Sequence, residues 1–189
     1  MANKTELIVE QTQKWLHSFV VKFNLCPFAN REIKRGSLRL KVSQAKKTHT
    51  ALKDYFSEIN LLDHQREIET TLLIFPCLFN DFFDYLDFVE LCEKTLEVKG
   101  YVGIYQIASF HPDYCFSHED YDDVSNYTNR SPYPIIHLLR EESLEKAISA
   151  YDSIAEIPQK NINTLRKLGL EKVKRILRHC TFPESKAAY

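Results

Sequence analysis

The stretch TTLLIFP, residues 70–76, has the composition of a buried β-strand, and the neighbouring segments organise around it. β-branched and apolar side chains fill the run, and Pro76 ends it. Upstream, GSLRLKVS (36–43) alternates apolar and basic side chains, which predicts a second strand with one solvent-facing side. Apolar residues recur at helical spacing between the two runs, over 52–62. The order strand, helix, strand favours a βαβ crossover.

The remaining segments complete an alternating pattern. An amphipathic helix is expected before Pro27, and a capped helix that starts at Asn80 or Asp81 is expected to end at Gly100. Strands are predicted over 101–110 and 134–140. Helices are predicted over 143–151, from Pro158 to Gly169, and over 170–180. We therefore predict one α/β (or α+β) domain over residues 1–189, with a mixed sheet of about four strands and helices packed on it.

Charge and cysteine content restrict the classes of partner. The chain of 189 residues has a formal net charge of -1, so its overall charge favours neither nucleic acid nor an anionic membrane. No apolar run reaches the roughly 18 residues of a membrane span, and the start lacks the pattern of a signal peptide. The five cysteines show no CxxC spacing and suit reduced thiols. We expect a cytoplasmic protein; its oligomeric state stays open.

The connection between the third and fourth strands, residues 111–133, is longer than the roughly 12–15 residues of an ordinary loop. Its five aromatic residues favour an ordered loop over a disordered one. The loop starts with His111 at a strand end and Asp113 two residues later. A carboxylate that orients an imidazole makes a plausible general base, so both are candidate catalytic residues. The alternative is that they cap a turn.

The second half of this loop, SNYTNRSPYP (125–134), is rich in hydrogen-bond donors. Arg130 is a candidate clamp for a phosphate or carboxylate, with further candidate substrate-binding residues at Asn126, Thr128, Asn129 and Tyr133. Alternatively, Arg130 pairs with an acidic residue of the same loop, Asp122 or Asp123. His137 points to the opposite side of its strand from Ile136 and Leu138, and it is either a further candidate or a core histidine.

Cys26, in NLCPFANREIKRG (24–36), precedes a short predicted helix with basic residues. A helix N-terminus and nearby cations favour a thiolate, so Cys26 is a candidate nucleophile that could pair with His111. The alternative is a small buried side chain. His111, Asp113, His118, Glu119 and His137 could supply metal ligands, but none shows a spacing typical of a metal site, so the sequence specifies neither metal nor cofactor.

Basic residues concentrate in the C-terminal segment, over 160–178. Such a segment can contact RNA or an acidic partner. A solvated helix face is the simpler interpretation, because no aromatic residue or nucleic-acid motif accompanies the charges. We therefore expect no nucleic-acid partner.

Several motifs together resemble one bacterial family, domain of unknown function 1415: NLCPFA (24–29), ETTLLIFP (69–76), DFFDYLDF (81–88), ASFHPDYCF (108–116) and NYTNRSPYPIIHLLRE (126–141). The resemblance runs from about Trp15 to Gly169. It implies a single domain of this length and supplies no activity. Within the matching motifs lie Cys26, Glu69, His111, Asp113, Asn126, Thr128, Asn129, Arg130 and His137.

Two functions from different classes follow. The first is an enzyme that acts on a small anionic metabolite by acyl or phosphoryl transfer or hydrolysis, with the His111–Asp113 pair as acid/base, the Arg130 clamp and Cys26 as a possible nucleophile. The second is a non-catalytic binding or adaptor protein that uses the 111–133 loop as a recognition surface. A pocket lined by His111, Asp113, Arg130 and His137 would favour the enzyme.

Overall fold

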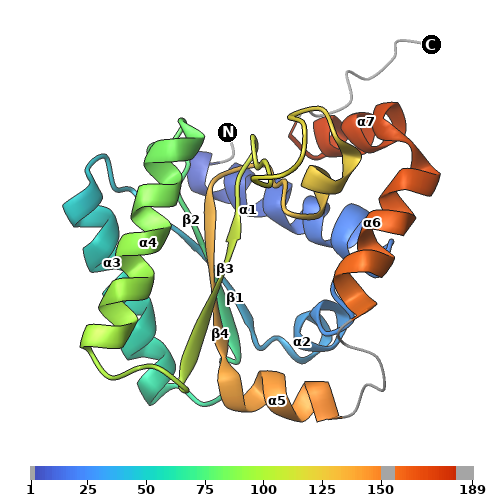
Figure 1. Ribbon diagram of the computed structural model, residues 1–189. Helices are drawn as coiled ribbons and strands as arrows, with labels where there is room; N and C mark the ends of the chain where they lie inside the picture. The colour runs from blue at the N-terminus through green and yellow to red at the C-terminus, as the bar shows by residue number, and fades with distance from the viewer. Residues whose placement is uncertain (1–2, 150–155, 182–189) are drawn as a thin grey trace.

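The computed structural model describes residues 3–149 and 156–181, with backbone only for 146–149. Figure 1 shows a sheet with helices on both sides. The strands are β1 (Leu38–Val42), β2 (Thr70–Ile74), β3 (Tyr105–Phe110) and β4 (Ile135–Arg140). The helices are α1 (Lys4–Trp15), α2 (Ala29–Arg35), α3 (Thr48–His64), α4 (Phe82–Val98), α5 (Glu141–Ser149), α6 (Ile157–Leu168) and α7 (Leu170–Thr181), with a π-helical segment η1 (Leu16–Val21) and a 3-10 helix η2 (Val124–Thr128).

The four strands form one mixed sheet in the order β1-β2-β4-β3. β1 and β2 pair in parallel through the α3 crossover, whereas β4 runs antiparallel to both of its neighbours, β2 and β3. The predicted α/β class with a four-stranded mixed sheet is confirmed. The C-terminal ends of β1, β2 and β3 share one edge of the sheet, and the 111–133 loop leaves β3 there (Figure 1).

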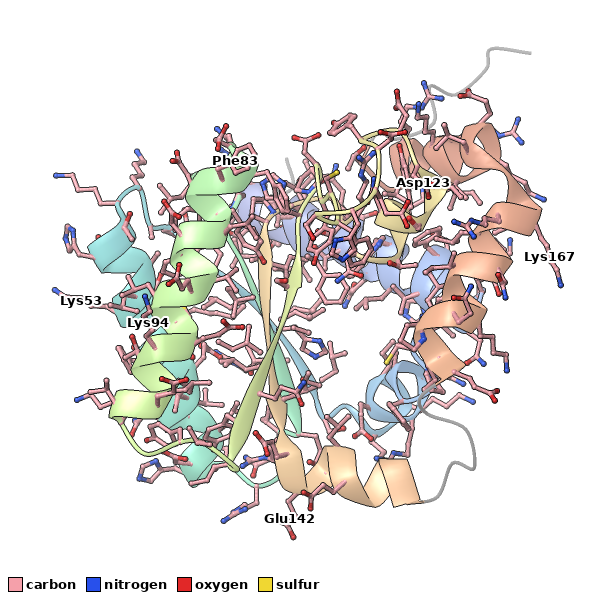
Figure 2. The ribbon with its side chains drawn as sticks, viewed as in Figure 1. Lys53, Phe83, Lys94, Asp123, Glu142 and Lys167 are labelled. Carbon is pink, nitrogen blue, oxygen red and sulfur yellow. The ribbon has the colours of Figure 1, made fainter. Side chains whose placement is uncertain are left out.

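Two apolar cores lie on opposite faces of the sheet. Helices α3 and α4 cover one face, where Tyr55, Leu73, Phe88 and Ile136 are among the buried residues. Helices α1, α2, α6 and α7 cover the other face, and this core is built around Trp15. Polar side chains lie on the outer sides of both helix layers: Lys53 of α3 and Lys167 of α6 point away from the sheet on opposite sides of the molecule (Figure 2). The result is three layers in which both faces of the sheet are covered.

Two elements differ from the sequence prediction. The strand predicted over 101–110 begins only at Tyr105, because residues 102–104 form a turn in which Gly103 has φ 79°. The helix predicted over 143–151 begins at Glu141, directly after β4, and its predicted last residues lie outside the described chain. Ser143, the first residue of the predicted range, lies inside the first turn of the helix, and its hydroxyl donates to the Glu69 carboxylate. An apolar run does not by itself distinguish a turn from a strand. The hydrogen-bond partner of a serine can be a residue distant in sequence, which the local sequence does not indicate.

Candidate functional site

His111 is fully buried beside α4 rather than open to a substrate. Its Nε2 lies 2.9 Å from the Phe79 carbonyl oxygen, and its Nδ1 accepts a hydrogen bond from the Asp113 backbone N–H at 3.0 Å. Nε2 is therefore the protonated nitrogen. The ring also packs between Phe82 and Tyr85, with centroid distances of 5.2 and 5.0 Å. Both nitrogens are engaged by backbone groups, so this geometry leaves none free to take a proton from a ligand.

The Phe79 backbone explains why a histidine occupies this position. Phe79 has φ 63°, a left-handed conformation that is rare for a bulky side chain, and its ring stacks on Phe88 with centroids 4.4 Å apart. The His111 N–H satisfies the carbonyl of this unusual turn. Burial lowers the pKa of His111, and the hydrogen bond to Phe79 opposes that shift. A neutral ring that holds two backbone segments together is a structural role.

Asn126 joins the two halves of the loop. It is fully buried; its Oδ1 accepts from the Phe116 N–H at 2.9 Å, and its Nδ2 donates to the Asp120 and Tyr121 carbonyls at 2.8 and 3.1 Å. All of the polar atoms of this side chain are thus used inside the protein. The residue orders the loop and presents no atom to a ligand.

Three other predicted binding residues also make internal bonds. Thr128 Oγ1 lies 2.9 Å from both the Ser125 carbonyl oxygen and Asn129 Oδ1. Asn129 Nδ2 donates to the Ser109 carbonyl at 3.2 Å, which ties the loop back to β3. The Tyr133 hydroxyl donates to Gln11 Oε1 of α1. These bonds position the loop against the sheet and α1.

Arg130 is buried, with 4% of its surface exposed, and its guanidinium is held by the loop itself. Nε donates to the Tyr114 carbonyl at 3.0 Å, and Nη2 donates to the Tyr121 carbonyl at 2.8 Å. The group also lies over two aromatic rings, 4.6 Å from the centroid of Tyr121 and 4.3 Å from that of Tyr127. The predicted alternative of an ion pair with Asp122 or Asp123 is not what the structure shows. The structure gives Nη1 no hydrogen bond to any part of the chain that it describes.

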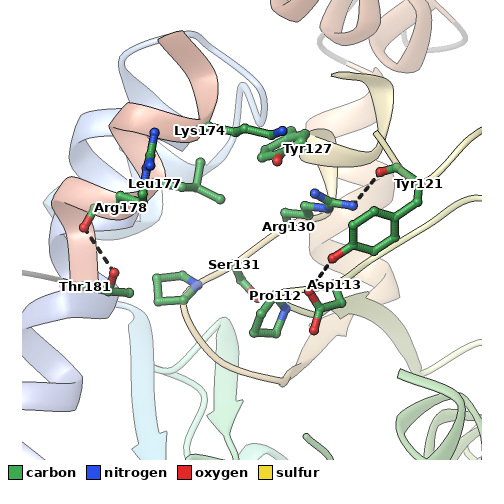
Figure 3. Close-up of a pocket in the computed structure, with 11 residues that line it drawn as sticks. Pro112, Asp113, Tyr121, Tyr127, Arg130, Ser131, Lys174, Leu177, Arg178 and Thr181 are labelled. Atoms are coloured by element: carbon green, nitrogen blue, oxygen red, sulfur yellow. Dashed lines mark hydrogen bonds between the residues drawn. The ribbon is translucent and has the colours of Figure 1, made fainter. Parts of the chain in front are cut away.

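A groove of about 340 Å³ separates the loop from α7 and is called the loop–α7 groove below. Figure 3 shows loop residues on one side of it and α7 residues on the other. Its lining consists of Pro112, Asp113, Tyr121, Tyr127, Arg130, Ser131, Pro132, Lys174, Leu177, Arg178 and Thr181. The structure therefore brings Asp113 and Arg130 to one groove and leaves His111 and His137 outside its lining.

The charges around the groove are predominantly positive. Arg130, Lys174 and Arg178 line it, against the single carboxylate of Asp113. Asp113 Oδ1 accepts a hydrogen bond from the Tyr121 hydroxyl at 2.7 Å, and this bond raises the pKa of Tyr121. Lys174 makes one long ion pair, at 3.4 Å, with the exposed carboxylate of Asp122. Exposed pairs of this kind contribute little, so an incoming anion can compete for the lysine.

Cys26 and His111 lie on opposite faces of the sheet. Cys26 packs against the core under α1 and α7, whereas His111 packs against α4. Burial raises the pKa of the Cys26 thiol, and hydrogen bonds from the backbone at Phe28 and Ala29 offset part of that effect. The geometry therefore does not form the Cys26–His111 pair, and it favours a neutral thiol.

His137, in the middle of β4, faces the same side of the sheet as Cys26. Its Nε2 lies 2.6 Å from Thr70 Oγ1 of β2. Its ring centroid lies 6.2 Å from that of Phe110. Burial lowers its pKa to about 4, so the imidazole is neutral at pH 7.

Within residues 3–149 and 156–181, side chains of His, Cys, Asp and Glu form no group of three or more that could hold a metal ion. The same part of the chain contains no helix whose length and hydropathy would allow it to cross a membrane. The five cysteines, all of which lie in that part, are free thiols.

Residues 7–175 match the family model described as "Protein of unknown function (DUF1415)". The chain belongs to this family. The match covers the 111–133 loop and extends into α7 as far as Arg175, beyond the resemblance that the sequence motifs indicated. No curated protein and no solved structure matches the chain. The DUF1415 family therefore supplies the relationship, and the chemistry must be argued from the site itself.

Sequence reasoning missed the contribution of α7 to the groove. Lys174 and Arg178 were assigned to a solvated basic helix face, and Thr181 was not considered. One signal was present: the apolar residues of 170–177 recur at helical spacing, so one side of this helix had to pack on the domain and bring neighbouring cations with it. The segment on which it packs could not be identified from the sequence.

Proposed function

We propose that the protein binds a small anionic molecule in the loop–α7 groove and acts as a non-catalytic binding protein. The observation that carries this proposal is the buried guanidinium of Arg130 in the groove lining, with Lys174 and Arg178 contributed by the facing helix. Three cations from segments distant in sequence converge on one concavity, against one carboxylate. Such an arrangement attracts carboxylates and phosphates.

Arg130 is prepared for this role by its surroundings. Two backbone carbonyls and two aromatic rings fix the guanidinium plane, so little side-chain entropy remains to be lost when a ligand binds. Arginine offers five N–H donors, and the hydrogen bonds to the two carbonyls leave donors on Nη1 and Nη2 for an anion. Recognition through the edge of a fixed guanidinium favours a carboxylate or phosphate oxygen.

The size of the groove favours a metabolite over a macromolecule. Small-molecule sites commonly occupy about 300–1,000 Å³, and the groove, at about 340 Å³, is at the lower end of that range. The Tyr121 and Tyr127 rings and Leu177 add apolar surface beside the cations. A ligand with one or two anionic groups and a short apolar or planar body suits this lining.

Binding without catalysis is favoured because neither of the two histidines predicted for the site offers a free ring nitrogen to the groove. Both ring nitrogens of His111 are hydrogen-bonded to backbone groups, and His137 is not part of the lining. Asp113 lines the groove, with one oxygen bonded to Tyr121. The enzyme hypothesis would require His111 to give up a bond that satisfies a buried carbonyl. We place this binding activity in the cytoplasm, because five free thiols suit a reducing compartment.

Isothermal titration calorimetry with inorganic phosphate and with citrate tests the proposal. The double variant Lys174→Gln/Arg178→Gln removes the two α7 cations, while the matched control Lys172→Gln/Arg175→Gln removes two exposed α7 cations outside the lining. We expect the first to weaken binding by about tenfold or more, equivalent to about 1.4 kcal/mol, and the control to weaken it by less than about threefold. Equal losses in the two variants would indicate nonspecific attraction to a basic helix, and absence of binding by the wild-type protein would refute the proposal.

A further inference from the structure

A row of four residues crosses the sheet face under α1, and one of them is a histidine in a central strand. Backbone register aligns Leu40 of β1, Leu72 of β2, His137 of β4 and Ala108 of β3. Paired residues of neighbouring strands point to the same face, so these side chains form one band. The band lies on the face opposite α3 and α4, apart from His111.

Burial along β4 shows that the cover over this band is incomplete. Ile136 and Leu138, on the α3 and α4 side, are fully buried, whereas His137 between them retains partial exposure, as do Leu40 and Ala108 of the same row. The next row toward the loop, which contains Ile74 and Ile135, is fully buried at those two positions. Leu72, the fourth member of the row, is 2% exposed, and Leu40 and Ala108 lie in the edge strands β1 and β3. Helices therefore close this face beside the loop and over Leu72, and they leave His137 partly exposed in a central strand.

Hydrogen bonding to Thr70 determines which nitrogen of His137 carries the proton. Thr70 Oγ1 lies 2.6 Å from the Leu138 carbonyl oxygen and 2.6 Å from His137 Nε2. A hydroxyl has one proton, and the carbonyl can only accept, so that proton goes to Leu138. Thr70 Oγ1 must then accept from His137, which places the imidazole proton on Nε2. The other nitrogen, Nδ1, carries a lone pair.

Nδ1 is unprotonated and is not fully enclosed. The structure gives Nδ1 no hydrogen bond within the residues that it describes. In that part of the chain, the fully buried side-chain atoms without a hydrogen-bond partner are Trp15 Nε1, Thr71 Oγ1 and Ser125 Oγ. Nδ1 is not among them, so it keeps some exposed surface. It is therefore an acceptor that solvent or a ligand can reach. His111 has the same protonated nitrogen, but its Nδ1 is already paired with the Asp113 N–H.

The chemical character of the band indicates what this acceptor could receive. Its other members are aliphatic, and the Phe110 ring lies beside the imidazole. The cations and anions of β1 point to the other face, where Arg39 pairs with Glu58 of α3 at 2.7 Å. A neutral imidazole among apolar side chains attracts neither an anion nor a cation, and it accepts one hydrogen bond.

We propose that the band Leu40–Leu72–His137–Ala108 is the floor of a second site, which binds a small neutral molecule with an apolar body and one hydroxyl or N–H group that donates to His137 Nδ1. This site is independent of the loop–α7 groove, which takes anions at the edge of the sheet. Specificity comes from the fixed tautomer: a molecule that lacks the donor leaves Nδ1 without a partner. The low pKa of His137 keeps the lone pair available at neutral pH.

Side-chain nitrogen NMR of the full chain tests the tautomer directly. Long-range proton–nitrogen correlation at pH 7 distinguishes protonated from unprotonated ring nitrogens, and the signals that disappear in His137→Gln identify the residue. We expect an unprotonated Nδ1 in the wild type. We expect a mixture of tautomers in Thr70→Val, which removes the acceptor at similar volume. A protonated Nδ1 in the wild type would overturn the proposal.

Phenol and anisole form a matched pair of probes for the ligand class, since both are apolar rings and only phenol donates a hydrogen bond. We expect phenol to shift the His137 Nδ1 signal saturably and anisole to leave it unchanged. The His111 signals, from a ring with both nitrogens engaged, serve as the internal reference. His137→Leu removes the Nδ1 lone pair together with the donor toward Thr70, and we expect it to weaken phenol binding about fivefold. Equal responses to both probes would show a merely apolar surface, and no response to phenol would show no site; either result refutes the proposal.

Discussion

Arg140 of β4 and Tyr105 of β3 are paired residues at the end of the sheet opposite the loop, and Arg140 Nη1 donates to the Tyr105 hydroxyl at 3.3 Å. The same guanidinium donates to the Ile68 and Gln65 carbonyls, each at 3.1 Å, and to the Leu62 carbonyl. The Tyr105 hydroxyl donates to Asp63 Oδ1 at 2.7 Å, which brings a carboxylate into the network. One buried arginine thus bonds the Leu62 carbonyl in the last turn of α3 and two carbonyls of the segment that follows, and it joins that end of the helix to the sheet.

We predict that Arg140→Met lowers the free energy of unfolding by about 2–4 kcal/mol, because it leaves several buried carbonyls without donors. Urea-induced unfolding followed by circular dichroism measures the change. Arg66→Met, at an exposed position in the turn after α3, is the matched control and should change stability by less than about 0.5 kcal/mol. Comparable losses in the two variants would contradict the role assigned to this network.

His111 gives a second stability prediction, which also separates a structural from a catalytic role. Replacement by Leu removes the donor to the Phe79 carbonyl and the acceptor for the Asp113 N–H, both in a buried place. We expect His111→Leu to lower the free energy of unfolding by about 2–4 kcal/mol. Thermal denaturation with and without citrate is the measurement. A variant as stable as the wild type would return His111 to the list of candidate catalytic residues.

The fold was largely predictable because its signals are local. TTLLIFP and PIIHLLR are apolar runs delimited by prolines, and both became strands within two residues of the predicted limits. The start of β3 was not predictable from its apolar residues. The stretch YVGIYQ reads as a strand, but Gly103 at φ 79° turns the chain before Tyr105.

The site was predictable only in part because its partners are distant in sequence. The length and composition of the 111–133 loop directed attention to Asp113 and Arg130, which both line the groove. The bond of His111 to the Phe79 carbonyl spans 32 positions, and the contact between the loop and α7 joins segments more than 40 positions apart. A histidine followed by Asp has the same local sequence whether its ring is free or fully bonded, so only the fold distinguishes the two cases.

The pH dependence of stability gives a third prediction, from His137. Its pKa falls from 6.5 to about 4 on folding because burial disfavours the charged ring. Between these values the unfolded chain binds more protons than the folded one, so the free energy of unfolding falls as the pH falls. The contribution is complete above about pH 6.5 and is lost progressively toward pH 4. The full shift corresponds to about 3 kcal/mol.

Comparison of the wild type with His137→Gln isolates this contribution, because acidic residues and His111 affect both proteins alike. Urea unfolding at intervals from pH 7.5 to 4.5 gives the two curves. We expect the wild type to lose about 1–3 kcal/mol more than the variant over this range. Parallel curves would mean that His137 titrates alike in the folded and unfolded chains, contrary to its burial.

Cys26 gives the last prediction. An activated nucleophile reacts rapidly with alkylating reagents, whereas a partly buried neutral thiol reacts slowly. Burial raises the pKa of this thiol, so its reactive thiolate is scarce at pH 7. We expect iodoacetamide to alkylate Cys26 at least about tenfold more slowly in the folded protein than in the chain unfolded by guanidinium chloride, with a rate that rises with pH above neutrality. Peptide mass spectrometry resolves Cys26 from the other four cysteines, and Cys26→Ser should retain citrate binding because the residue lies outside the loop–α7 groove. Rapid alkylation of Cys26 at pH 7 in the folded protein would show an activated thiolate and would favour the enzyme hypothesis over simple binding.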